Sequence, residues 1–279
     1  MAFGDLTRVG ANFHALEALF SLKRINGQMG VHQSALATGK RINSAQDDTA
    51  GYSIARSLES RGRGLSQALD NVSTAKNVLN IAEGGFQAQM SILQTIKEKA
   101  TQASDGSWDS TQREAINDQV SALLSEVDDI AGQTKFNGYT LMSNSFTYQV
   151  GEESSDQLTV DIDSSTSSAI GESDTDLSGI SLSTQASASA AIDTLTTAID
   201  SLAASIQSMG DFQARISSKE ESLSVAITNT EATRSRIEDA DFAKEQMEMI
   251  KLQILQQTSV SSFVQANSAP QMVLSLFGR

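Results

Sequence analysis

The sequence predicts a mainly α-helical protein, an elongated antiparallel helical bundle or coiled coil formed by its N-terminal and C-terminal segments. A small β-hairpin region is expected at the end distal to the termini. Three observations support this prediction. The 279 residues include a single proline and 5% aromatic residues, a composition that suits long helices. Residues 189–266 repeat apolar side chains at three- and four-residue steps without a proline, and residues 52–103 show the same spacing.

These two long segments are expected to pack against each other. A continuous helix over residues 189–266 would be ~115 Å long, which no compact domain of this chain length contains. The returning segment is therefore expected to lie antiparallel to the helix of residues 52–103, because each then covers the apolar stripe of the other.

The N-terminal segment, residues 1–37, is amphipathic and is predicted to be helical. Gly10, Gly27 and Gly30 each weaken a helix by roughly 1 kcal/mol relative to alanine, so this helix should form well only with packing partners. The following residues 38–50 are polar. Within them, Ser44 followed by Asp47 fits the capping-box start of the next helix.

The first long helix is expected over residues 52–103, with the glycine pair that ends at Gly85 as a weak point. Turn chemistry at Asp105 and the glycine after it ends this helix. Thr111 and Glu114 then have the spacing of a capping box and predict the start of a second helix of about twenty residues.

A short β region is expected between the second helix and the returning helix. Asn137 followed by glycine is a strong turn signal. Residues 146–150 and 158–162 alternate apolar and polar side chains and predict a β-hairpin. Residues 164–187 are rich in Ser, Thr, Gly and Asp and are interpreted as a loop. Between residues 136 and 214 there is no Lys or Arg, so this middle region is expected to form an acidic, solvated surface.

The last forty residues carry more apolar surface than one partner helix can cover. Between Met247 and Val264 the apolar side chains fall on two faces of the predicted helix. One antiparallel partner from residues 1–37 covers only one of these faces. The second face therefore predicts contacts with other copies of the chain, and an open helical filament requires such contacts to be heterologous.

Several sequence blocks, spread over nearly the whole chain, resemble the bacterial flagellins. The N-terminal block runs from Arg41 to Gly51 and reads RINSAQDDTAG, and the C-terminal block runs from Ala232 to Glu245 and reads ATRSRIEDADFAKE. Further similar blocks are NIAEG at 80–84, LLSEVD at 123–128, FNG at 136–138, QVG at 149–151, QILQQ at 253–257, QAN at 265–267 and PQMVLSL at 270–276.

The resemblance implies a structural subunit that polymerises into the flagellar filament, the helical propeller used for swimming. It also implies five parts. Residues 1–43 and 241–279 correspond to the filament-core segments, residues 44–145 and 188–240 to a helical shell domain, and residues 146–187 to the hairpin and acidic loop. The short connection between hairpin and returning helix implies a minimal flagellin that lacks a substantial outer domain.

The resemblance also implies site residues. Contacts in the filament core are expected at Phe13, Leu16, Phe20, Ile25, Ile250, Ile254, Val260, Phe263, Val264, Leu274 and Leu276. Signature contacts are expected at Arg41, Asn43, Asp47, Asp48, Arg234, Arg236, Asp239, Asp241 and Phe242. We interpret the acidic cluster from Glu238 to Asp241 as a charged helix face answered by Arg234, Arg236 and Lys244.

The expected partners are further copies of the chain, the hook-junction and filament-cap proteins, and a flagellin-specific export chaperone. The expected place is the filament outside the cell, reached through the flagellar type III pathway without a cleaved signal peptide. The chain departs from the family pattern in residues 1–33, which carry extra residues and aromatics. It also has Thr95 and Lys99 where the family has other residues in the surface read by the vertebrate Toll-like flagellin receptor, which argues against recognition by that receptor.

Other classes of function fit less well. The net charge of −14 argues against nucleic-acid binding, and no run of eighteen apolar residues predicts membrane insertion. The two histidines, His14 and His32, lack nearby partners at metal-ligand spacing, so no metal or cofactor is expected. No nucleophile–base pair predicts an enzyme. A soluble helical binding module and a hook-junction protein remain alternatives, and the first predicts a chain that stays monomeric or dimeric.

Overall fold

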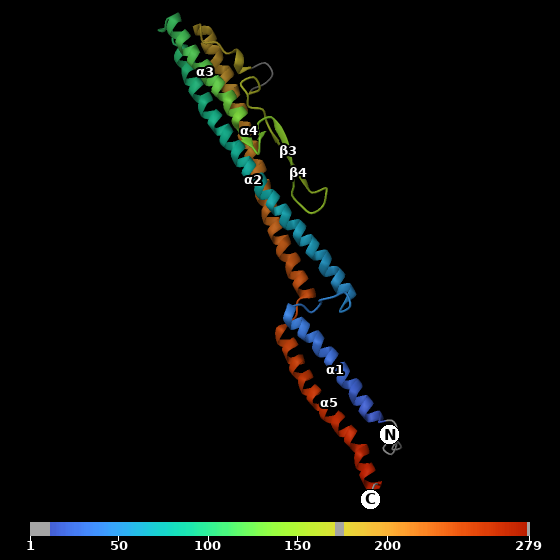
Figure 1. The fold of residues 1–279 in the computed structure, drawn as a ribbon. Coiled ribbons are helices and arrows are strands. Elements are labelled where there is room, and N and C mark those ends of the chain that lie inside the picture. Colours follow the sequence, from blue (N-terminus) through green and yellow to red (C-terminus); the bar gives the residue numbers. More distant parts are fainter. Residues whose placement is uncertain (1–11, 171–175, 278–279) are drawn as a thin grey trace. The chain divides into compact units, whose positions relative to one another are not determined.

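The computed structural model describes residues 12–170 and 176–277, with side chains described up to residue 268 in the last helix. Figure 1 shows a mainly α-helical chain with a small antiparallel hairpin, as predicted. The described residues also form a second hairpin of two-residue strands, around the turn signal at Asn137. The elements in order are α1 (Phe13–Thr38), α2 (Thr49–Ala103), α3 (Ser110–Gln133), β1 (Lys135–Phe136), β2 (Tyr139–Thr140), β3 (Asn144–Gln149), β4 (Gln157–Ile162), the 3-10 turn η1 (Leu177–Gly179), α4 (Gln185–Glu238) and α5 (Phe242–Phe277).

The chain forms two compact units. We call residues 1–60 with 229–279 the terminal unit, and residues 61–228 the central unit. The terminal unit contains 11 basic and 11 acidic residues, whereas the central unit contains 9 basic and 23 acidic residues. The whole net charge of −14 therefore resides in the central unit, and the terminal unit is neutral overall.

The terminal unit is built on the antiparallel pair of α1 and α5, which lie side by side in Figure 1. Three polar contacts fix their register. Asn12 Nδ2 donates to the carbonyl of Ala266 at 2.6 Å, Gln256 Nε2 donates to Asn26 Oδ1 at 2.7 Å, and His32 Nδ1 lies 2.5 Å from Glu245 Oε2. Residue numbers rise along α1 while those of their partners fall along α5, so the two helices run antiparallel. This confirms the predicted antiparallel packing of the N-terminal and C-terminal segments.

The central unit has a coiled-coil core. Buried side chains recur every seven residues on both long helices, the period of an apolar coiled-coil seam. These are Leu65, Val72, Leu79, Phe86, Leu93 and Ala100 on α2, and Leu195, Leu202, Met209, Ile216 and Leu223 on α4. The helices are antiparallel, because Lys76 pairs with Glu220 at 2.9 Å and Gln213 donates to Glu83 at 2.7 Å. Each fully buried large apolar side chain contributes ~1.5–3 kcal/mol.

The predicted hairpin is present as β3 and β4, in which Phe146 pairs with Val160. Leu158, Val160 and Ile162 alternate with exposed residues and face the core. The structure refines where this hairpin lies. Asn71 Nδ2 of α2 donates to the carbonyl of Gln149, and Arg61 pairs with Glu152 at 2.8 Å, so the hairpin turn lies beside the Arg61 part of α2 and not at its Ala103 end.

The loop after β4 is more deeply packed than its polar composition predicted. Ser165, Ser167, Ile170, Leu177 and Leu182 are all buried. The side chains of Gln89 and Asp128 bond this loop: Gln89 Nε2 donates to the carbonyl of residue 165 at 3.0 Å, and Asp128 accepts from the backbone N–H of residue 167 at 2.6 Å. The expectation of a fully solvated loop was therefore wrong, because distant polar side chains satisfy its backbone groups.

The glycine at position 85 has a packing role. Gly85 was predicted to be a weak point of the helix, yet α2 continues through it. A Cβ added to Gly85 would lie 2.6 Å from Met142 Cε and 2.7 Å from Thr134 Oγ1. The absence of a side chain thus lets the segment that carries β1 and β2 approach α2 closely.

Two predicted capping boxes differ in detail from the observed ones. At the start of α3, Asp109 and Gln112 form the reciprocal capping box, and Thr111 and Glu114 do not. Before α2, Asp47 accepts from the backbone N–H of Asn43 and of residue 44, which forms a turn two residues ahead of the helix start at Thr49. Both elements begin close to where the sequence predicted them.

Candidate interaction surface

Large apolar side chains are exposed mainly on the two helices of the terminal unit. We call this set the apolar surface; it includes Phe20, 69% exposed, and Met247, 65% exposed. Its members are Phe13, Leu16, Leu19, Phe20 and Val31 on α1, with Phe242, Met247, Ile250, Ile254, Leu255, Val260 and Val264 on α5. A concentration of exposed large apolar side chains on one helix pair indicates an interaction surface.

The apolar surface remains open because a two-helix pair has only one inner face. Ile25 and Leu252, which are 6% and 5% exposed, lie in that inner face together with Ala15 and Ala35 of α1. Among the described residues of α1 and α5, the exposed apolar side chains lie outside this inner face. The sequence prediction that one antiparallel partner cannot cover both apolar faces of α5 agrees with this burial pattern.

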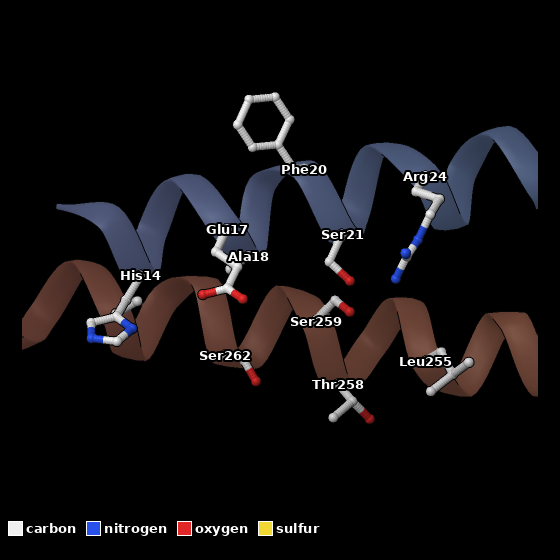
Figure 2. A pocket seen from close by; sticks show the side chains of 11 residues that line it. His14, Glu17, Ala18, Phe20, Ser21, Arg24, Leu255, Thr258, Ser259 and Ser262 are labelled. Carbon is white, nitrogen blue, oxygen red and sulfur yellow. The ribbon is translucent and has the colours of Figure 1, made fainter. Parts of the chain in front are cut away.

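A groove of about 670 Å³ runs between α1 and α5. Figure 2 shows Glu17, Ser21 and Arg24 reaching from α1 toward α5, whereas Phe20 projects away from α5. The groove is lined by His14, Glu17, Ala18, Phe20, Ser21, Arg24, Leu255, Thr258, Ser259, Ser262 and Ala266. Small side chains predominate on the α5 side, which explains why the two helices leave space between them.

In the terminal unit, the connection between α1 and α2 pairs with the connection between α4 and α5; we call these two connections the paired links. Lys40, in the connection from α1 to α2, forms an antiparallel β-bridge with Asp239, in the connection from α4 to α5. The backbone N–H of Arg41 donates to the carbonyl of Glu238 at 2.7 Å, and that of Ala240 donates to the carbonyl of Gly39 at 2.9 Å. These bonds end α4 at Glu238, so the long apolar repeat of the sequence is interrupted here.

The buried carboxylate of Glu238 is the ionic centre of this pairing, with a side chain that is 2% exposed. It accepts from Lys40 Nζ at 2.8 Å and from the guanidinium of Arg56, which also pairs with Glu59. The guanidinium of Arg41 donates to the carbonyl of residue 237 at 2.7 Å. Cations from the N-terminal part of the chain thus neutralise and cap the end of α4.

This arrangement corrects the predicted pairing of the acidic cluster with Arg234, Arg236 and Lys244. Arg234 instead pairs with Glu231: its guanidinium donates to the Glu231 carboxylate, and this hydrogen bond raises the pKa of Arg234. Asp241 accepts from the backbone N–H of residues 243 and 244 at 3.0 and 3.2 Å, so it caps the start of α5. Helical spacing alone could not show that Glu238 turns toward a distant segment.

The turn before α2 is also held by carboxylates. Hydrogen bonds from the backbone N–H of Ser44 and then of Asn43 lower the pKa of Asp47. Asp48 Oδ1 accepts from the backbone N–H of Gly51 at 2.9 Å. A Cβ at Gly51 would lie 2.5 Å from Asp48 Oδ2 and 2.7 Å from Ile42 Cδ1, so the turn requires glycine there.

Among residues 12–170 and 176–277, no group of three or more His, Cys, Asp or Glu side chains has the geometry to hold a metal ion. His14 lines the groove, and His32 contacts Glu245. Across the same part of the chain, no helix has the length and apolar character needed to span a bilayer.

Comparison with known proteins identifies the family. Residues 9–147 match the profile of the bacterial flagellin N-terminal helical region, and residues 190–277 match that of the bacterial flagellin C-terminal helical region. The chain belongs to the bacterial flagellin family. Flagellin is a structural protein, so the family assignment agrees with the expectation that the chain is not an enzyme.

Named relatives of this flagellin extend over nearly the whole chain. Flagellin FlaB1 of Treponema pallidum is 32% identical over 282 residues, covering 96% of this chain and 99% of the relative. The flagellar filament core protein flaB2 of Brachyspira hyodysenteriae is 30% identical and the flagellin of Bacillus subtilis 31% identical, each with the same two coverages. A crystal structure of Bacillus cereus flagellin is 23% identical, covers 55% of this chain and 88% of its own, and has a TM-score of 0.48.

Most of the predicted core-contact residues of this flagellin lie on the apolar surface. Phe263 is half-buried, and Ile25 is buried in the inner face of the pair of α1 and α5; their contacts with neighbouring copies stay predictions. The side chains of Leu274 and Leu276 lie outside the described part of the chain. The signature residues from Arg41 to Asp48 and from Arg234 to Phe242 gather around the paired links. The prediction missed Glu238 and Arg56 as partners, although Glu238 stands inside the C-terminal block.

Replacing Glu238 with glutamine is expected to loosen the paired links. Lys40 and Arg56 would lose the buried negative charge between them, and because both cations are partly exposed, we expect a loss of ~1–2 kcal/mol. Amide hydrogen exchange at Arg41 and Ala240 should accelerate ~5–30-fold. Asp239→Asn is the matched control, because that side chain is exposed and its residue joins the bridge through the backbone. Equal exchange in both variants would contradict the assigned role of Glu238.

Proposed function

We propose that this flagellin assembles with further copies of itself into the bacterial flagellar filament, which works outside the cell as a helical propeller. The observation that carries the proposal is the apolar surface on α1 and α5, which one chain leaves uncovered. Relatives named as filament core proteins support it. Burying such surface between copies is favourable by about 25 cal/mol per Å² of apolar area.

The terminal and central units differ in net charge, which supports different roles for them in the filament. The terminal unit has equal numbers of acidic and basic residues, so copies can approach through it without net repulsion. The central unit has 23 acidic and 9 basic residues and keeps the assembled chains solvated. Residues 1–43 and 241–279 are accordingly proposed as filament core, residues 44–145 and 188–240 as the surrounding shell, and residues 146–187 as the part of the shell nearest solvent.

The predicted contact residues take two roles in this proposal. Exposed members of the apolar surface, such as Phe13, Ile250 and Val264, contact neighbouring copies. The signature residues around the paired links, such as Arg41 and Asp241, hold α1 and α5 in the geometry that presents this surface. The side chains at the end of α5, including Leu274 and Leu276, are proposed to continue the contact.

Further partners are proposed from membership of the flagellin family. A free chain exposes the apolar surface before assembly, and an export chaperone would bind that surface and shield it from water. Hook-junction and filament-cap proteins would contact the same helices at the two ends of the filament. Export through the flagellar type III pathway is the proposed route to the filament. Thr95 and Lys99 are the reason for proposing no recognition by the Toll-like flagellin receptor.

Purified full-length chain is expected to form long filaments, and more readily as salt rises. Between about 10 mM and 150 mM NaCl the Debye length falls from ~30 to ~8 Å, which screens the repulsion between acidic central units. The critical concentration for assembly, measured by sedimentation and electron microscopy, should fall accordingly. A chain that remains monomeric or dimeric at every salt concentration would contradict the function and favour a soluble binding module.

A further inference from the structure

We propose that the groove between α1 and α5 of one copy receives the Phe20 side chain of a second copy. This inference rests on the proposed assembly of the chain and specifies one of its contacts. It joins the most exposed apolar side chain of α1 to the 670 Å³ groove that borders it. The occupant is thus a second copy of this chain, and the contact is repeated by every copy.

The groove can admit an aromatic ring because small side chains form much of its wall, with polar and apolar groups both present. Ala18, Leu255 and Ala266 contribute carbon atoms. The hydroxyl of Thr258 donates to the carbonyl of residue 254 at 2.9 Å, so its own helix satisfies that group. Ser259 adds little bulk. A buried aromatic side chain typically removes ~150–250 Å² of surface from water, which makes such an insertion a substantial contact.

The Phe20 side chain points away from its own helix pair and is free to contact a second copy. It stands at the rim of the groove, is 69% exposed, and points away from α5 in Figure 2, so it does not fill the groove that it borders. A projection and a recess on the same helix pair, facing different directions, form a heterologous contact. Repetition of a heterologous contact that does not close into a ring generates an open filament.

The neutral charge of the terminal unit favours a second copy of this chain over a strongly charged partner. The terminal unit is neutral overall, so it offers no net field that would select a strongly acidic or basic ligand. Arg24 and Glu17 both line the groove, so the groove itself carries one charge of each sign and does not select an acidic or a basic partner. The chain also supplies one Phe20 for every groove, the stoichiometry that a homopolymer needs.

Photo-crosslinking tests the contact with the full-length protein. A chain carrying Phe20→p-azidophenylalanine is mixed with ¹⁵N-labelled unmodified chain, assembled, irradiated and digested. Crosslinks from position 20 to residues 255–266 of the labelled chain are expected, and the isotope separates them from links within one chain. The same analogue at Val31, an exposed apolar position of α1 outside the groove, is the control and should not yield these peptides.

A blocking variant gives an independent readout. Ser259→Phe fills the groove and is expected to raise the critical concentration about tenfold, whereas Ser261→Phe places the same ring at an exposed position that does not line the groove. Filaments in which position 20 crosslinks elsewhere, or in which both serine variants assemble alike, would overturn the Phe20 contact and leave the proposed function intact. If the unmodified chain forms no filaments, it is the proposed function that fails.

Discussion

Deleting residues 260–279 is expected to abolish filament formation while the central unit stays folded. The deletion removes Val260 and Val264 from the apolar surface and also the Ala266 carbonyl that holds Asn12. Burial of the two valines alone is worth ~3–6 kcal/mol, so the critical concentration should rise ~100-fold or more. Electron microscopy and sedimentation measure the loss of filaments.

The full-length chain at the same salt concentration is the control. Far-ultraviolet circular dichroism and the unfolding of the central unit should match between the two proteins, because the buried core from Leu65 to Leu223 lies outside the deletion. Filaments from the truncated chain would show that the end of α5 is dispensable. Loss of the central unit's unfolding transition would show that the deletion acts through folding instead.

Replacing Phe86 with alanine is expected to destabilise the central unit by about 3–5 kcal/mol. Phe86 is fully buried at a seven-residue position of α2, and its loss leaves a cavity beside the α4 seam. Urea unfolding followed by circular dichroism measures the change. Filament assembly should weaken only as far as the unfolded fraction increases.

Ile81→Ala is the matched control on the same helix. Its side chain is 41% exposed, so its truncation should cost under about 1 kcal/mol. If the two variants are equally stable, the seven-residue seam does not carry the core of the central unit. A much greater loss in the Ile81 variant would instead point to an unrecognised contact of the free α2 face.

The long helices could be predicted because their signal is local. Apolar residues at three- and four-residue steps placed the first helix at 52–103, and α2 spans Thr49–Ala103. The alternation in residues 146–162 likewise placed β3 and β4, since the period of two belongs to each strand separately. The excess of apolar groups after Met247 also predicted a surface left open on α5, because a helix with two apolar faces exceeds the cover of one partner.

Contacts between distant segments escaped the sequence analysis. The apolar repeat runs through residues 189–266, yet the chain leaves the helix at Asp239 because its backbone pairs with Lys40. Gly85 was interpreted as a weak point of the helix, but the structure shows Met142 close to the position that a Cβ there would take. Gln89 and Asp128 bury a loop that composition assigned to solvent. In each case the partner lies tens of residues away or more, beyond any local pattern.

Periodicity and composition were thus enough to predict a long, breaker-poor helical chain with matched apolar faces and terminal helices with more apolar surface than one partner covers, while the resemblance of sequence blocks pointed to the family. Those properties depend on residues at fixed short spacing. Folding added the features that depend on which distant groups meet: Glu238 enclosed between Lys40 and Arg56, Ile25 turned inward, and a groove beside the outward-pointing Phe20. The sequence predicts which face of a helix is apolar, because that face depends on residue spacing. Which distant side chain covers that face is decided only by packing in the folded chain.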